Sequence, residues 1–348
     1  MPLLQFTDKG IHCPLAGVYL DPWKPVERAI ISHGHSDHAY AGHQHYLCSA
    51  TAMPVIKHRL FLQDNAIQTL DFGEVLHING VQFSFHPAGH IPGAAQVRVE
   101  HKGEVWVFSG DYKLQHDGIS TPFEPQRCHV FITESTFGLP VYKWKTQNEV
   151  FNDINAWWIK NREEGKTCVI TGYTLGKAQR ILKNVDASIG KIFTHGAVDS
   201  VNRIMRAQGI DLPEAPRVSD DIPKDELKGA LVICPPSAVG SPWVRRFLPY
   251  SLGVASGWMK LRGTRRRRGA DRGFVLSDHA DWDELNTTIR ATGAERVFVT
   301  HGQVHPMVRW LCEQGLDAQS FATEYGDDEE SSETDTTAAG ADSEGSPS

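Results

Sequence analysis

The chain has 348 residues, of which 40% are hydrophobic and 22% are charged. That composition is enough to bury a sizeable core in one large or two moderate domains. No apolar run approaches the roughly 18 residues of a membrane span, and the N-terminus lacks the basic and apolar regions of a signal peptide. The six cysteines are scattered without a Cys-x-x-Cys pair, so we expect reduced thiols in a cytoplasmic protein, with no membrane and no disulfide framework.

The net charge of −7 is concentrated at the C-terminal end of the chain. Nine of the 42 acids lie from Glu324 onward, where there is no Lys or Arg, so the rest of the chain has 33 acids against 35 basic residues and a charge near +2. We expect residues 326–348 to form a disordered acidic tail. Such a tail either solvates the protein or competes with nucleic acid for a basic groove, and the sequence leaves both open.

Several short apolar runs predict β-strands, and a polar residue with metal-binding or acid-base chemistry follows each one. In chain order they are 29–32 before His33, 81–86 before His90, 105–109 before Asp111, 130–133 before Glu134, 273–277 before His279, and 296–300 before His301. This pattern is typical of an α/β sheet with functional residues at the carboxyl ends of its strands. A helix from Asp281 to Gly293 separates the last two strands. We expect a short crossover at one sheet edge, which would bring His279 and His301 together.

The middle of the chain alternates helix and strand again. We expect helices at 149–164 and 177–184, and strands at 168–171, 191–194 and 230–234. The pattern predicts a second α/β unit, inserted between the strand that ends at Glu134 and the strand before His279.

Three histidines and an aspartate fall within six residues directly after the first of these strands. Imidazole nitrogen and carboxylate oxygen are ligands that Zn²⁺ prefers in proteins. His33 and His35 alternate along an extended turn, so both can reach one ion, while Asp37 and His38 can reach a neighbouring ion. Gly34 permits the tight backbone path between them. The segment predicts the metal site of a two-metal hydrolase.

This HGHSDH segment resembles the His-x-His-x-Asp-His signature of the metallo-β-lactamase superfamily. Further motifs of that superfamily follow in order at Asp21, His90 and Asp111. The resemblance implies an α/β fold, the αββα sandwich. It also implies a ligand set: His33, His35 and His90 on one metal, Asp37, His38 and a later histidine on the other, and Asp111 as the bridge.

Three later motifs resemble those of the β-CASP nucleases, a branch of the superfamily. They are the acidic motif TESTFG with Glu134, the motif SDHAD with an active-site histidine at 279, and the motif THG with a metal-binding histidine at 301. The implied organisation is 1–144 and 266–325 for the two parts of the metallo-β-lactamase domain, 145–265 for a β-CASP insertion, and 326–348 for the tail. His195 has the same Thr-His-Gly context, but we favour His301 as the ligand because its strand follows His279 through one helix.

The chain also resembles the bacterial ligase-associated DNA exonuclease family, from residues 10–13 to 277–282. This implies a DNA exonuclease of DNA repair, with two Zn²⁺ ions (Mn²⁺ or Mg²⁺ as alternatives), and with a DNA ligase or helicase as a partner. A metal-bridged hydroxide would attack phosphorus, and His279 would protonate the leaving oxygen. Glu134 would hold His279 charged, and Asp37 completes the expected catalytic set. A β-CASP ribonuclease that processes RNA ends, and a nucleic-acid-binding scaffold without catalysis, stay open as alternatives.

Two segments are candidates to bind the nucleic-acid backbone. Residues 262–268 contain five arginines: Arg262, Arg265, Arg266, Arg267 and Arg268. They fit a cationic groove, and the alternative is a solvated loop. Residues 171–177 predict a strand, a glycine turn and a helix start, where amide groups and a lysine bind phosphate. The stretch resembles the Gly-Thr-Tyr-x-x-Gly-Lys segment of DNA-repair β-CASP nucleases, where a terminal phosphate is held. The expected contacts are Thr171, Tyr173, Thr174 and Lys177, and the alternative is an ordinary strand-to-helix turn.

Overall fold

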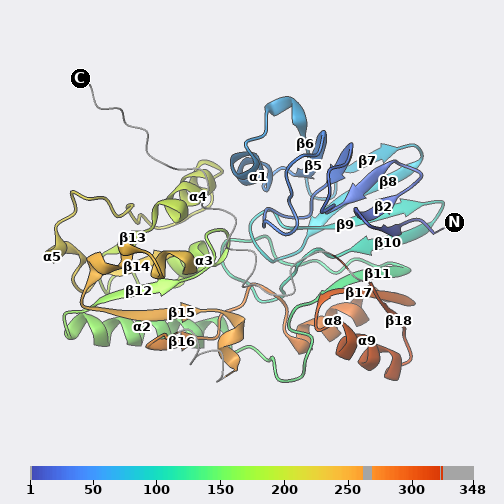
Figure 1. Cartoon of the computed structure of the whole chain (residues 1–348). Helices are drawn as coiled ribbons and strands as arrows, with labels where there is room; N and C mark the ends of the chain where they lie inside the picture. Colours follow the sequence, from blue (N-terminus) through green and yellow to red (C-terminus); the bar gives the residue numbers. More distant parts are fainter. Residues whose placement is uncertain (1, 262–268, 322, 324–348) are drawn as a thin grey trace.

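The computed structural model describes residues 2–261, 269–321 and 323, and it contains three β-sheets (Figure 1). The first sheet has six strands in sequence order: β1 (Gln5–Thr7), β2 (Gly10–Cys13), β3 (Val18–Leu20), β4 (Arg28–Ile30), β5 (His45–Ser49) and β6 (Ile67–Leu70). The second has seven strands in the order β18 (Asp317–Ser320), β17 (Arg296–Gly302), β11 (Val130–Ser135), β10 (Glu104–Phe108), β9 (Ala95–His101), β8 (Val81–Pro87) and β7 (Val75–Ile78).

These two sheets pack face to face and are covered by helices on their outer faces. Apolar side chains from both sheets, such as Ile30, Val97 and Ile132, form one buried core between them. Helix α1 (Met53–Leu60) packs on the outer face of the first sheet, and α8 (Trp282–Thr292) and α9 (Val304–Glu313) pack against the second. The layers are therefore helix, sheet, sheet and helix. This mixed α/β arrangement is consistent with the metallo-β-lactamase fold.

The third sheet is parallel throughout, in the order β13 (Ile192–Thr194), β14 (Leu231–Cys234), β12 (Thr167–Thr171), β15 (Tyr250–Ala255) and β16 (Arg272–Phe274). The helices around it are α2 (Gln147–Glu163), α3 (Lys177–Asn184), α4 (Gly196–Ala207), α5 (Lys224–Leu227) and α6 (Pro236–Val239). Both faces of β12 are buried, since Cys168 and Ile170 join one core cluster and Val169 joins another. Parallel strands that are covered on both sides show such continuous apolar runs.

Local sequence signals explain where two of these helices begin and end. Helix α2 follows Thr146, whose Oγ1 accepts from the Glu149 amide while the Glu149 carboxylate accepts from the Thr146 amide. Helix α8 follows Asp281, which accepts from the amide of Glu284. It ends at Gly293, whose φ of 65° lies in the left-handed region. The predicted helix from 281 to 293 is confirmed.

The strand before His279 differs from the prediction. It covers only 272–274, and it pairs with β15 at the edge of the third sheet, past the expected end of the insertion at residue 265. The strand before His301 lies in the second sheet. The expected crossover at one sheet edge is therefore wrong, because periodicity predicts a strand without saying which sheet it joins. Among the described residues, no helix has the length and apolar character needed to cross a membrane.

Candidate metal centre

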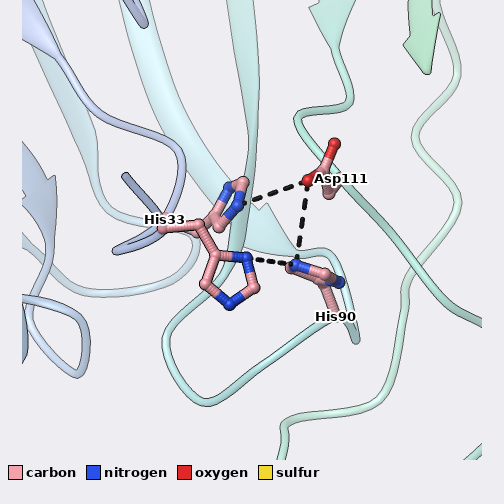
Figure 2. A group of neighbouring side chains, drawn as sticks. His33, His90 and Asp111 are labelled. Carbon is pink, nitrogen blue, oxygen red and sulfur yellow. Dashed lines mark hydrogen bonds and ion pairs between the residues drawn. The ribbon is translucent and has the colours of Figure 1, made fainter. Parts of the chain in front are cut away.

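Four histidines surround the buried carboxylate of one aspartate at the carboxyl ends of the strands. Figure 2 shows two of them, His33 and His90, beside this aspartate, Asp111. Asp111 Oδ2 lies 3.4 Å from Nε2 of both His33 and His38, and 3.8 Å from Nε2 of His90. Asp111 Oδ1 lies 3.1 Å from Nε2 of His301. Segments far apart in the sequence therefore present their nitrogens to a single carboxylate.

A glycine before the aspartate makes this close packing possible. Gly110 has a φ of 55°, and a Cβ atom there would stand 2.8 Å from the side chain of Ser32. Any other residue would push the Asp111 loop away from the start of the histidine-rich segment. The Ser-Gly-Asp sequence thus sets the distance between the two loops.

Each of three histidines donates one ring N–H to an oxygen outside the cluster. His38 Nδ1 lies 2.7 Å from Asp21 Oδ2. His35 Nε2 donates to the carbonyl of Leu175 (3.1 Å), and His90 Nδ1 donates to the carbonyl of Asp278 (2.6 Å). Such partners fix the tautomer and the ring orientation of metal-binding histidines. In each ring the second nitrogen is left to face the cluster.

The chemistry of these donors fits a cation. Burial lowers the pKa of His35 and lowers that of His90 well below the usual value, which favours neutral rings. Because each ring uses its N–H on a carbonyl, His35 Nδ1 and His90 Nε2 face each other with lone pairs across 3.0 Å. Two lone pairs at that distance repel each other unless they share a positive charge. A metal ion that binds both nitrogens removes the repulsion.

The spacing of the donor atoms also fits metal ligands. Ligand atoms about 2.1 Å from a tetrahedral zinc ion stand about 3.4 Å apart, which matches the separations of His33 and His38 from Asp111. Among the described residues, three groups of donor atoms within 4.8 Å of one another share that aspartate. The first is His33, His35, His90 and Asp111, the second is His38, Asp111 and His301, and the third is Asp111, Glu134 and His279.

The electrostatics of the shared aspartate point the same way. Burial alone would raise the pKa of Asp111, but the charges of His38, His279 and His301 outweigh it and hold the pKa well below its usual range. Burial likewise opposes a charge on His38, yet Asp111 and Asp37 raise the pKa of that imidazole well above its usual value. The cluster is therefore a buried anionic centre that takes up positive charge.

Two candidate residues stand apart from these groups: Asp37 of the HGHSDH segment, and His195, the alternative to His301. The Asp37 carboxylate is half-buried and its Oδ2 lies 3.9 Å from His38 Nε2, but Asp37 belongs to none of the donor groups found among the described residues. His195 caps α4, where its Nδ1 accepts from the Ala197 amide, and its ring packs against Trp243. Thus the structure brings His301, and not His195, to the metal cluster.

His279 lies beside the cluster and is held in place by Glu134 and Trp144. Its ring centroid stands 4.7 Å from that of His90, and its Nδ1 lies 2.9 Å from Glu134 Oε2. Glu134 is buried and also accepts from the amide of Tyr112 (2.8 Å). Trp144 donates its indole N–H to the carbonyl of His279 (3.0 Å). The Glu134 and Trp144 contacts therefore fix the orientation of the imidazole beside the cluster.

Only one of the two segments expected to contact nucleic acid, residues 171–177, lies within the described residues. Thr171 ends β12 and is buried, and Tyr173 and Thr174 are half-buried in the turn that follows. Lys177 begins α3 but is buried: its Nζ lies 3.9 Å from Asp278 Oδ2 and 4.5 Å from the ring centroid of Tyr173. The five arginines at 262–268 and the acidic tail lie outside the described residues.

The residues that orient the histidine rings could not be identified from the sequence. The carbonyls of Leu175 and Asp278 orient His35 and His90, and neither residue type signals such a role. Asp21 was noted only as a motif. Its carboxylate accepts from the Ser32 amide (2.7 Å) and lies against His38. Only its position after an early strand could have suggested that function.

Comparison with known proteins identifies relatives of the chain. No family model matches the chain. A protein from Opitutus terrae named "Probable DNA ligase" is 33% identical over 312 residues, which is 89% of this chain but 30% of that protein. "Endoribonuclease YSH1" of Yarrowia lipolytica is 31% identical over 35% of the chain, and "Cleavage and polyadenylation specificity factor 73" of Drosophila melanogaster is 32% identical over 34%. The chain thus spans under a third of the length of each of these relatives.

A solved structure agrees on the fold. A protein of unknown function from Enterococcus faecalis V583 superimposes with a TM-score of 0.58 over 86% of this chain and 80% of its own, at 11% identity. The sequence matches, together with the buried histidine and aspartate cluster, show that the chain is related to metallo-β-lactamase proteins of the β-CASP branch. Within that branch, the match to the Opitutus protein over most of the chain fits the ligase-associated DNA exonuclease family.

Proposed function

We propose that the chain is a two-metal phosphodiesterase that shortens DNA from an end during DNA repair. The observation that carries this proposal is the buried Asp111, which four histidines surround at distances suited to ligands of shared ions. We assign His33, His35, His90 and Asp111 to one ion, and Asp37, His38, Asp111 and His301 to the other. Zn²⁺ suits this imidazole-rich set best, with Mn²⁺ or Mg²⁺ as alternatives.

His279 is the proton donor in this proposal. Bound divalent ions would acidify water and neutralise negative charge on the phosphodiester. The Glu134 carboxylate holds Nδ1 of His279, and we assign Nε2 of the same ring to give a proton to the departing oxygen. The negative charge of Glu134 favours the protonated ring before that transfer. Asp37 lies 3.9 Å from His38 Nε2 and serves as a more distant ligand.

The unit built on the third sheet is the β-CASP insertion in this proposal. Its parallel strands extend from β12 to β16, and β16 ends at residue 274. We therefore place the end of the insertion at about residue 274 and not at 265. The metallo-β-lactamase segments on either side of the insertion begin at residue 1 and end near residue 325. The turn at 171–177 and the arginines at 262–268 are the proposed nucleic-acid contacts. Since Lys177 is buried, we assign it a phosphate contact only after its pairing with Asp278 gives way.

DNA is preferred over RNA because a protein named as a DNA ligase matches 89% of this chain. A DNA ligase or helicase is the proposed partner on the same ground. The second candidate is a ribonuclease that acts on RNA ends, and it is favoured by the shorter matches to proteins named endoribonuclease. The third candidate is a nucleic-acid-binding scaffold without catalysis.

One experiment separates these three. End-labelled single-stranded DNA and RNA of one sequence, and a circular single-stranded DNA, are incubated with the protein and Zn²⁺, Mn²⁺ or Mg²⁺. The proposal predicts stepwise shortening of linear DNA, with circular DNA and RNA intact. Loss of RNA with DNA intact would establish the ribonuclease, and cutting of the circle would establish an endonuclease. No cleavage, together with less than one metal per purified chain, would establish the scaffold.

A further inference from the structure

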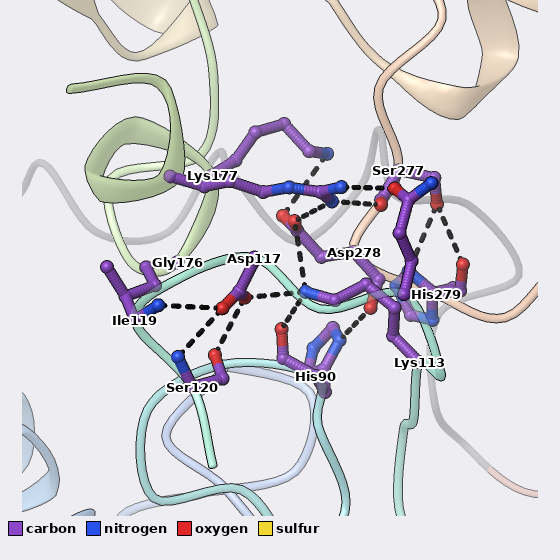
Figure 3. Close-up of polar contacts among 12 residues, drawn as sticks. His90, Lys113, Asp117, Ile119, Ser120, Gly176, Lys177, Ser277, Asp278 and His279 are labelled. Carbon is purple, nitrogen blue, oxygen red and sulfur yellow. Dashed lines mark hydrogen bonds and ion pairs between the residues drawn. The ribbon is translucent and has the colours of Figure 1, made fainter. Parts of the chain in front are cut away.

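Five buried charged side chains form a cluster beside the histidines of the candidate metal centre (Figure 3). They are the cations Lys113, Lys177 and Arg180 and the carboxylates of Asp117 and Asp278, each at most 3% exposed. Buried charges are tolerated in proteins only when they are paired and hydrogen-bonded. Lys177 and Arg180 belong to α3, beside the third sheet, whereas Lys113 and Asp117 follow β10 of the second sheet. The cluster therefore joins two parts of the fold.

Asp278 is the carboxylate that all three cations share. Its Oδ1 accepts from Arg180 Nη1 (3.1 Å) and lies 3.9 Å from Lys113 Nζ, and its Oδ2 lies 3.9 Å from Lys177 Nζ. Burial would raise the pKa of Asp278, but the charges of Lys177, Lys113 and Arg180 outweigh it and lower the pKa. Arg180 Nη1 also donates to the carbonyl of Ser277 (2.6 Å). The backbone at 277–278 is thus fixed to α3.

The same backbone orients two histidines of the candidate metal centre. The Asp278 carbonyl accepts from His90 Nδ1, and the Leu175 carbonyl, two residues before α3, accepts from His35 Nε2. A Cβ atom on Gly176 would stand 2.3 Å from the side chain of Ile91, so only glycine lets the start of α3 pack this closely against the loop after His90. Lys113 Nζ donates to the His90 carbonyl (3.1 Å) from the other side.

We propose that Arg180 and Asp278 are positioning residues that turn the rings of His35 and His90 toward their common metal ion. Arg180 fixes α3 to the segment at 277–278, and both carbonyls that hold the two rings lie on or next to these elements. A change in how α3 packs against the segment at 277–278 therefore changes the affinity of the site for metal. The inference rests on the proposed metal function, and it adds two residues that touch neither metal nor substrate.

A purely structural cluster would affect stability and leave metal affinity unchanged. A positioning cluster affects both, because changes to the outer partners of metal-binding histidines reduce affinity about 10- to 100-fold. Arg180→Gln is the informative variant. It leaves two cations facing two carboxylates, so the protein should fold even if Asp278→Asn, which leaves three cations facing one carboxylate, does not.

The test measures Zn²⁺ dissociation constants by competition with a chromophoric chelator, alongside thermal unfolding of the metal-free proteins. Arg206→Gln is the matched control, because this half-buried arginine lies on α4 of the same unit and donates to the carbonyls of Leu212 and Pro213. We expect Arg180→Gln to raise the dissociation constant about 10-fold or more. We expect Arg206→Gln to leave it within about 2-fold while lowering the unfolding temperature, because its partners lie outside the histidine cluster.

Two outcomes overturn the inference. If Arg180→Gln binds Zn²⁺ as tightly as the unaltered protein while unfolding at a lower temperature, the cluster is a structural clamp alone. If the unaltered protein binds no Zn²⁺, the proposed metal function fails along with it. Nuclease activity is absent from this test, so a wrong assignment of substrate leaves the inference standing.

Discussion

Two buried aspartates of this fold have different neighbours. Asp111 is surrounded by the imidazoles of His33, His38, His90 and His301. Asp278 is surrounded by lysine and arginine side chains. Both carboxyl groups are nearly inaccessible, and nearby positive charge lowers the pKa of both against the effect of burial.

The partners decide what each aspartate can do. An imidazole can lose its proton and offer a lone pair, so the histidines around Asp111 can exchange protons for a metal ion. Guanidinium and ammonium groups offer donors only, and the charge of Asp278 is already neutralised by the protein itself. Burial and a lowered pKa are common to the two carboxyl groups. They differ in the type of nitrogen nearby: imidazoles, which can bind a metal ion, surround Asp111, whereas ammonium and guanidinium groups, which can only donate, surround Asp278.

The largest effect is expected from Asp111→Ala, which removes the carboxylate that both ion positions share. We expect activity to fall at least about 1000-fold, which corresponds to about 4 kcal/mol of transition-state stabilisation. Metal content should also fall from two ions per chain toward none, as measured by mass spectrometry of the purified protein. A variant that keeps two ions would show that Asp111 is no bridge. Asp64→Ala, at an exposed position, is the control and should behave like the unaltered protein.

The next largest effect is expected from His279→Ala. Loss of a general acid reduces turnover by about 100-fold or more, and both metals should remain because His279 acts beside them. A p-nitrophenyl ester of thymidine 5′-phosphate sharpens the test, because its leaving group departs without protonation. The variant should lose much less activity on that ester than on DNA. Equal losses on both substrates, or loss of metal, would contradict the role of proton donor.

The histidine-rich segment shows what could be predicted from the sequence. Its spacing after a strand was enough to predict the metal cluster, since ligand chemistry is local. Glu134 and His279 were predicted by resemblance, and they do meet, at 2.9 Å across 145 residues of chain. By contrast, the partners of Asp278 come from residues 113, 177 and 180. Nothing in their spacing links them, because only the docking of the third sheet against the second brings them together. The same limit explains why β16 was assigned to the wrong sheet.

A smaller effect is expected from Glu134→Gln, which keeps the size of the side chain and removes its charge. The His279 Nδ1–H then donates to a neutral oxygen, and charge-assisted hydrogen bonds are roughly twice as strong as neutral ones. We expect turnover on DNA to fall about 10-fold while the Michaelis constant changes little. His279→Ala combined with Glu134→Gln should be no slower than His279→Ala alone. Additive losses would mean that Glu134 acts independently of His279.

The smallest effect is expected from deleting residues 327–348, a segment with eight acids and no Lys or Arg. These carboxylates have no basic neighbours in the sequence, in contrast to those of Asp111 and Asp278 in the fold. If they compete with nucleic acid for basic residues, the deletion should tighten DNA binding a few-fold at about 0.05 M salt, and the gain should vanish near 0.3 M because screening weakens both interactions. Fluorescence anisotropy with labelled DNA measures both conditions. Unchanged affinity at low salt would mean that the tail does not compete with nucleic acid and acts only as a solvating segment.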